Sequence, residues 1–269
     1  MNKKKIISTI LACAMLPFGG LISASAQDTK PTYVQLNPAD ASPFNNGEFQ
    51  GWGTALCWWA NRLGYSEKLT NAAAEAFFSD KGLGLDIARY NLGGGDDPTH
   101  NHINRSDSKV PGVYSAYKLS SDGKDVESIT YDITKDQNQL NIAKAALKAN
   151  PDLYFEGFSN SAPYFMTKTG CTSGGGTVNS DGTVTSNGNL NNLNDDMYDD
   201  FAKFIADATK LFKDNGIEFK SYSPMNEPDT DYWGYGSLKQ EGCHFDPGTS
   251  QSKMITETRK ALDNGGFKD

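Results

Sequence analysis

Glu227 has the most suggestive surroundings of any carboxylate in the chain, since it stands between Asn226 and Pro228. An extended apolar run ends there, and a loop rich in aromatic residues follows. Glycoside hydrolysis uses two carboxyl groups, one of which protonates the leaving oxygen. We therefore interpret Glu227 as a candidate proton donor and acceptor, and Asn226 as a candidate ligand for a neighbouring sugar hydroxyl. An isolated Asn-Glu-Pro is, however, more often a solvated turn.

The aromatic residues after Glu227 favour the chemical interpretation. Tyr232, Trp233 and Tyr235 follow within eight positions. Flat apolar sugar faces stack on such rings, and a purely structural loop has little reason to expose three of them. The segment is therefore predicted to bind a carbohydrate, with Trp233 among the contacting residues.

Two further apolar runs carry polar residues that belong to the same hypothesis. Arg89 stands at the end of one run, and a buried arginine requires a partner. It is either half of a structural ion pair or the group that keeps a catalytic carboxylate ionised. Glu156 lies within the next run, a position more typical of a hydrogen-bonded structural group. Asn160, Ser161 and Tyr164 lie nearer to the end of that run, where a ligand is expected.

The loop after Arg89 contains Asp96, Asp97, His100 and His102. Their spacing matches no strong zinc pattern, so a polar loop that touches substrate is the favoured interpretation over a metal site. The three glycines before Asp96 lack the GxGxxG spacing and the helix of a dinucleotide fingerprint. We expect neither a metal nor a cofactor.

The elements that position these residues repeat in a regular order. Four times, a short apolar run is followed by a polar loop and an amphipathic helix, the first of which has Ser66 as a suitable N-cap. This alternation predicts parallel strands joined by right-handed crossovers, with ligands at the carboxyl ends of the strands. It fits an open doubly wound sheet or half of an eight-fold barrel. The expected helices cover about 66–79, 136–150, 195–214 and 250–264, and the polar segment 170–192 is expected to be mobile surface.

The N-terminus has the order of a bacterial secretory signal. Three lysines precede an apolar run and the small residues Ala24, Ser25 and Ala26, which predicts a signal peptide over 1–26. Its removal changes the formal charge from −8 to −11, because it carries three lysines and no acidic residue. An acidic exported protein is a poor candidate for binding nucleic acid. Outside the N-terminus no apolar stretch is long enough to span a membrane, so a secreted, periplasmic or cell-surface protein is expected.

Three cysteines remain after the expected cleavage. Cys57 lies in an apolar run and is interpreted as a buried thiol. Cys171 and Cys243 lie in polar loops, and an exported protein can join such residues in a disulfide. We expect a disulfide between Cys171 and Cys243 as one of two equal alternatives, the other being two free thiols.

Five ordered motifs together resemble glycoside hydrolase family 30, close to its endo-β-1,6-galactanase branch. They are GWGTALCWWANRLG, GLGLDIARYNLGGGDDPTHNHI, FEGFSNSAPYFMTKTGC, PMNEP and QEGCHF, and they span 51–245. The family has a (β/α)₈ barrel of the TIM-barrel type and cleaves with retention of configuration. The resemblance implies that Glu227 is the acid/base, that Asn226 contacts a sugar hydroxyl and that Arg89 lies near the nucleophile. It also implies substrate contacts at Trp58 and Asn160, and no cofactor.

The resemblance is to the N-terminal half of the family. Its nucleophile is a glutamate at the end of a seventh strand, and Glu241 lies too close to Glu227 to take that place. We therefore expect a segment 27–49 with one strand, followed over 50–269 by the first four β/α units of a truncated barrel that is inactive alone. The expected substrate is a polysaccharide or oligosaccharide, β-1,6-galactan first. The alternatives are β-1,6-glucan, xylan or glucosylceramide, or a glycan-binding protein without catalysis.

Overall fold

The computed structural model describes residues 44–97, 102–237 and 239–268. The predicted signal peptide over 1–26, residues 27–43 of the segment expected to contain one strand, and His100 lie outside the described residues. The chain divides into one unit that ends at Glu48, with a short 3₁₀ helix η2 (Phe44–Gly47), and a second unit from Phe49 onward. All elements below belong to the second unit.

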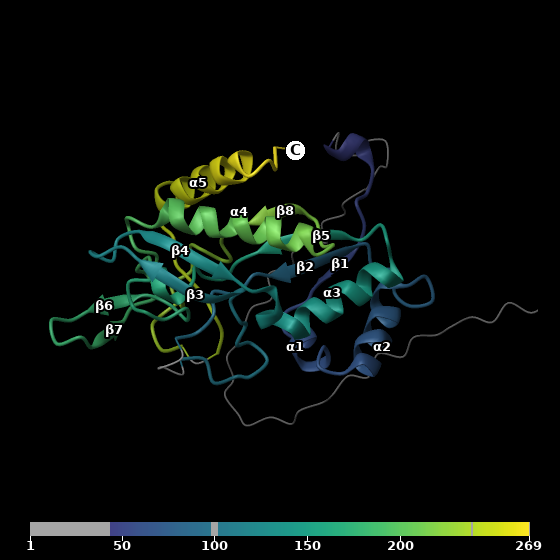
Figure 1. The fold of residues 1–269 in the computed structure, drawn as a ribbon, viewed down its shortest axis with the longest axis horizontal. Helices are drawn as coiled ribbons and strands as arrows, with labels where there is room; N and C mark the ends of the chain where they lie inside the picture. Colours follow the sequence, from purple (N-terminus) through teal and green to yellow (C-terminus); the bar gives the residue numbers. More distant parts are fainter. Residues whose placement is uncertain (1–43, 98–101, 238, 269) are drawn as a thin grey trace, which may run out of the picture. The chain divides into compact units, whose positions relative to one another are not determined.

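A parallel sheet forms the centre of this unit (Figure 1). Its strands are β1 (Gly53–Ala55), β2 (Ile87–Asn91), β5 (Tyr154–Phe158) and β8 (Phe219–Ser223), in the spatial order β1-β2-β5-β8. All three neighbouring pairs are parallel. Spatial order therefore follows chain order, as it does in successive units of a β/α barrel. The predicted alternation of parallel strands and helices is confirmed.

Four helices agree with the sequence periodicity: α2 (Glu67–Phe78), α3 (Gln137–Ala149), α4 (Tyr198–Asp214) and α5 (Ser250–Asn264). The short helix α1 (Trp59–Leu63) was not predicted, because its residues belong to an apolar run that was expected to form a strand. Ser66 caps α2 as expected, since its hydroxyl accepts a hydrogen bond from the Leu69 N–H. Only α4 begins later than predicted, because Asp195 and Asp196 form a turn before it.

Two antiparallel hairpins were not predicted. The first joins β3 (Tyr114–Leu119) to β4 (Val126–Tyr131), within what was expected to be a long loop before α3. The second joins β6 (Gly176–Val178) to β7 (Val184–Ser186), inside the segment 170–192. The expectation of surface is confirmed for residues 177–190, which are mostly exposed, but residues 171–175 are buried and the hairpin has a regular ladder.

One face of the sheet packs against α3 and α4 (Figure 1). Tyr90 projects from this face into the core, with its ring centroid 4.8 Å from that of Phe212 in α4. Its hydroxyl donates to Oδ2 of Asp136, 2.8 Å away, and Gln139 donates to the same oxygen at 2.6 Å. Because side chains alternate along a strand, Arg89 next to Tyr90 points to the opposite face. The packing of Tyr90 therefore fixes the direction in which Arg89 projects.

Within the described residues, every helix is too short or too polar to cross a lipid bilayer.

Candidate functional site

An ion pair lies on the sheet face opposite to α3 and α4. Arg89 in β2 and Glu156 in β5 are register partners, with Nε and Oε1 3.1 Å apart. The Arg89 guanidinium also lies over the ring of Phe158, 3.7 Å from its centroid, and Phe158 is buried. The two charged side chains are 29% and 31% exposed, so solvent reaches both. Glu156 is thus the partner that the sequence required for Arg89.

The same arginine reaches the loop that follows β8. Its Nη1 donates to Oδ1 of Asn226 at 3.3 Å. With Oδ1 engaged in this way, the Nδ2 group is the donor that the Asn226 side chain has left. Arg89 therefore connects β2 and β5 to the segment that carries Asn226 and Glu227. Arg89, Glu156 and Asn226, all singled out from the sequence, form one contact group.

Glu227 is held by its own loop. Its backbone has φ = 47°, a value that few residues with a side chain adopt. Its carbonyl oxygen accepts hydrogen bonds from the Thr230 hydroxyl at 2.8 Å and from the Trp233 indole at 3.0 Å. The carboxylate is exposed, and its Oε2 accepts from the Tyr232 hydroxyl at 2.7 Å. An acid that solvent reaches and that neighbours orient can exchange a proton with a bound ligand.

The aromatic residues after Glu227 differ from each other in exposure. Tyr232 is 53% exposed, whereas Trp233 is 4% exposed. The expectation that Trp233 presents its ring to a sugar was wrong, because the indole is packed inside the loop. Tyr235 is half-buried, with its ring centroid 5.5 Å from that of His102. Of the three rings, Tyr232 is the one that offers most of its surface to a ligand.

The other predicted ligand contacts follow the carboxyl ends of β1 and β5. Trp58 is half-buried after β1 and lies 5.4 Å from the Arg105 guanidinium. Asn160 and Ser161 are buried after β5. Tyr164 begins the 3₁₀ turn η4 (Tyr164–Met166) and packs against Tyr117 and Phe165 rather than against Glu227. The structure therefore places these residues after the carboxyl ends of β1 and β5, while direct contacts join Arg89 to Glu156 and to Asn226, the residue before Glu227.

The acidic loop after β2 places Asp96 close to two basic side chains. Asp96 lies 3.3 Å from Nδ1 of His102 and 3.3 Å from Nζ of Lys109. Across the described ranges, no three His, Cys, Asp or Glu side chains are grouped so as to hold a metal ion.

Glu241 is a buried acid whose place the sequence did not reveal. It is 1% exposed, and its Oε1 accepts from the Gly94 N–H at 3.1 Å. Burial is the main reason why the pKa of Glu241 is raised well above its usual value. The contact joins the loop that carries Glu227 to the loop that follows Arg89. The motif QEGC gave no signal for this role, because the partner is a backbone group almost 150 positions away.

Cys171 and Cys243 are free thiols in the structure, so the expected disulfide between them is not formed. Cys171 lies 2.9 Å from the Ser173 hydroxyl, and Cys243 contacts Asn191 with Sγ 3.7 Å from Oδ1. Each sulfur is packed among different neighbours. The polar composition of the two loops could not show this. Burial raises the pKa of Cys243 to about 11, and that of the third free thiol, Cys57, to about 12.

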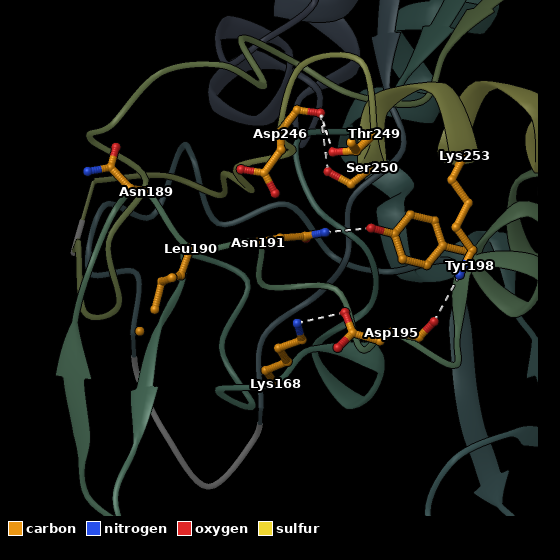
Figure 2. Close-up of a pocket in the computed structure, with 11 residues that line it drawn as sticks. Lys168, Asn189, Leu190, Asn191, Asp195, Tyr198, Asp246, Thr249, Ser250 and Lys253 are labelled. Atoms are coloured by element: carbon orange, nitrogen blue, oxygen red, sulfur yellow. Dashed lines mark hydrogen bonds and ion pairs between the residues drawn. The ribbon is translucent and has the colours of Figure 1, made fainter.

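A separate cavity of about 560 Å³ lies at the N-terminal ends of α4 and α5 (Figure 2). Both lysines that line it contact Asp195: Nζ of Lys168 lies 2.8 Å from its Oδ1, and Nζ of Lys253 lies 3.0 Å from its carbonyl oxygen. Asn191 donates to the Tyr198 hydroxyl at 2.5 Å. None of the residues predicted to contact a glycan lines this cavity.

Two curated proteins are similar to most of the chain. An endo-β-1,6-galactanase of Hypocrea rufa is 29% identical over 87% of this chain and 47% of its own length. An exo-β-1,6-galactobiohydrolase of Bifidobacterium longum subsp. longum is 29% identical over 86% of this chain and 17% of its own. The chain thus spans less than half the length of either relative.

A solved structure and a family model agree with these similarities. The crystal structure of a conserved exported protein from Bacteroides fragilis superposes with a TM-score of 0.65, at 26% identity, over 81% of this chain and 42% of that one. The model of O-glycosyl hydrolase family 30, whose members have a TIM-barrel-like fold, matches residues 44–258. The chain therefore belongs to O-glycosyl hydrolase family 30.

Proposed function

We propose that Glu227 is the general acid/base of a retaining endo-glycosidase that hydrolyses β-1,6-galactan or a similar β-glycan. The observation that carries the proposal is the contact group in which Arg89 holds Asn226 beside the exposed, loop-oriented carboxylate of Glu227. The names of the two curated relatives support β-1,6-linked galactan as the first substrate to test.

The proposed mechanism uses Glu227 twice. As an acid it protonates the leaving glycosidic oxygen, and as a base it takes a proton from the water that completes hydrolysis. Asn226 donates to a sugar hydroxyl, and Trp58, Asn160 and Tyr164 are the proposed further contacts. Retention needs a second carboxylate about 5 Å from the acid/base, and the proposal assigns that role to no described residue. The four β/α units correspond, in this proposal, to the first four of an eight-unit barrel.

The test compares the whole protein with its E227Q variant. We expect E227Q to lose about 10²- to 10⁴-fold in kcat on β-1,6-galactan, because glutamine cannot donate a proton to the leaving oxygen. The loss should be much smaller on an aryl galactoside whose leaving group departs without protonation. The matched control is E127Q, which alters an exposed glutamate in β4 that pairs with Lys118.

The outcomes separate the candidate functions. Equal turnover by E227Q and wild type on galactan would remove Glu227 from the acid/base role. Parallel assays on β-1,6-glucan, xylan and a glucosylated lipid decide among substrates within the same mechanism. Binding of galactan by the whole protein without turnover of any of these substrates would support a non-catalytic glycan-binding protein instead.

We also propose that the protein is exported through the predicted signal peptide over 1–26. The order of lysines, apolar residues and Ala24-Ser25-Ala26 supports this proposal. Expression in a bacterial host, followed by fractionation and N-terminal sequencing, should give an extracytoplasmic protein that begins at Gln27. A cytoplasmic protein with an intact N-terminus would contradict it.

A further inference from the structure

We propose that Tyr232 and Trp233 are positioning residues for Glu227: Trp233 fixes its backbone, and Tyr232 fixes its carboxylate. The inference rests on the proposed acid/base role of Glu227, and it gives these two aromatic residues a function other than stacking on a sugar.

The backbone of Glu227 is the first thing that must be held. Its positive φ is strained for a residue with a side chain, and such a conformation persists only where neighbours determine it. The Trp233 indole N–H and the Thr230 hydroxyl both donate to the Glu227 carbonyl oxygen, at 3.0 and 2.8 Å. These two bonds close the loop onto Glu227 and so favour the observed direction of its side chain.

Trp233 can act as an anchor because it is itself fixed on several sides. A Cβ at Gly242 would lie 2.1 Å from Cε3 of the indole, and one at Gly174 would lie 2.3 Å from the Trp233 carbonyl oxygen. That carbonyl accepts from the Gly175 N–H at 2.9 Å, while Gly242 donates to Thr172 at 2.8 Å. Gly242 thus lies against the indole, while Gly174 and Gly175 lie against the Trp233 backbone. With 4% of the residue exposed, the ring offers no surface for a glycan to stack on.

Tyr232 completes the arrangement from the solvent side. Its hydroxyl donates to Oε2 of Glu227 at 2.7 Å, and its ring packs edge-on against Trp233 with centroids 4.7 Å apart. The hydrogen bond to Glu227 is the main cause that raises the pKa of Tyr232 above its ordinary value. Because the phenol occupies Oε2, Oε1 is the oxygen left to exchange a proton with the glycosidic oxygen and with water.

The first test does not depend on activity. Titration of the tyrosines by NMR in the whole protein identifies Tyr232 as the signal that is lost in Y232F. In E227Q, the pKa of Tyr232 should fall toward its ordinary value, because a neutral amide replaces the carboxylate. Y65F is the matched control, since Tyr65 is exposed and lies after α1. An unchanged pKa of Tyr232 in E227Q would overturn the inference, whatever the enzyme's activity.

The second test uses kinetics. Y232F should lower kcat on galactan by about tenfold or more with a smaller change in KM, and the loss should shrink on an activated aryl galactoside. W233F should lower kcat in the same way while keeping most of the packing. A stacking role predicts instead that Y232F, which keeps the ring, behaves like wild type.

The two tests also distinguish failures. If the pKa of Tyr232 responds to E227Q but the whole protein hydrolyses no glycan, the hydrogen bond stands and the proposed function fails. If hydrolysis depends on Glu227 but Y232F has wild-type kcat, KM and pH profile, the positioning role fails and the acid/base role stands. Should W233F not fold, Y232F decides alone, since its hydroxyl lies on the exposed side of the loop.

Discussion

Arg89 and Glu156 form an ion pair between two neighbouring parallel strands, with Nε and Oε1 3.1 Å apart. The same guanidinium donates to Oδ1 of Asn226, the residue before the proposed acid/base. Glu156 therefore orients Arg89, and Arg89 in turn orients Asn226. Glu156, which the sequence presented as a structural group, becomes a second support for the loop after β8.

The first prediction concerns Glu156. Because both partners are about one third exposed, E156Q should change the free energy of unfolding by only about 1 kcal/mol or less. It should weaken the binding of galactan oligosaccharides more clearly, since the guanidinium loses the charge that orients it toward Asn226. Chemical denaturation and titration calorimetry measure the two effects. A large loss of stability with unchanged binding would show that the pair serves only the fold.

A second prediction concerns pH and the buried Asp136. Burial raises the pKa of Asp136 to about 7, so the folded state favours the protonated acid. Its contribution to stability is present below pH 4 and is lost as pH rises through 7, by up to roughly 4 kcal/mol at 1.4 kcal/mol per unit. In D136N, which resembles the neutral acid, this pH dependence should disappear. Urea denaturation from pH 4 to 8 measures it.

Wild type and D136N share the buried acid Glu241, whose raised pKa acts in the same direction. The comparison between the two proteins therefore isolates Asp136. Parallel stability curves for wild type and D136N over this pH range would show that Asp136 titrates normally in the fold.

A third prediction uses the glycine that faces Trp233. G242A should destabilise the protein by about 1–3 kcal/mol, because the added Cβ would lie 2.1 Å from the indole. G265A at the end of α5 is the control, since its Cβ would have no neighbour closer than 3.3 Å. Thermal unfolding compares them. Equal stability of G242A and G265A would mean that the indole is loosely held.

A fourth prediction concerns the thiols. Cys171 and Cys243 should both be alkylated after unfolding without any reductant, because neither is in a disulfide. In the folded protein at pH 8 they should react slowly with a disulfide reagent, since burial raises the pKa of both thiols and keeps them protonated. Mass spectrometry of the labelled peptides measures both states. A peptide pair that is linked until reduction would contradict this prediction.

Elements with strong local signals could be predicted from the amino-acid sequence. Helical periodicity predicted the approximate length of α4 and the bounds of α5, and Ser66 predicted the start of α2. The alternation of strands and helices indicated the parallel sheet. It also predicted a turn to loop near Asn226, which follows β8, whereas Arg89 was expected at the end of its strand and lies in the middle of β2, in register with Glu156.

Which of these residues contact one another depends on how the elements pack in the fold. Arg89 contacts Glu156 and Asn226 across 67 and 137 positions of the chain, and Glu241 contacts Gly94 across 147. Whether Trp233 is exposed, and whether Cys171 meets Cys243, depends on segments that arrive from elsewhere in the fold. Local sequence reflects interactions between residues that are close along the chain. It does not show which distant segments pack against the Trp233 indole or separate the sulfurs of Cys171 and Cys243.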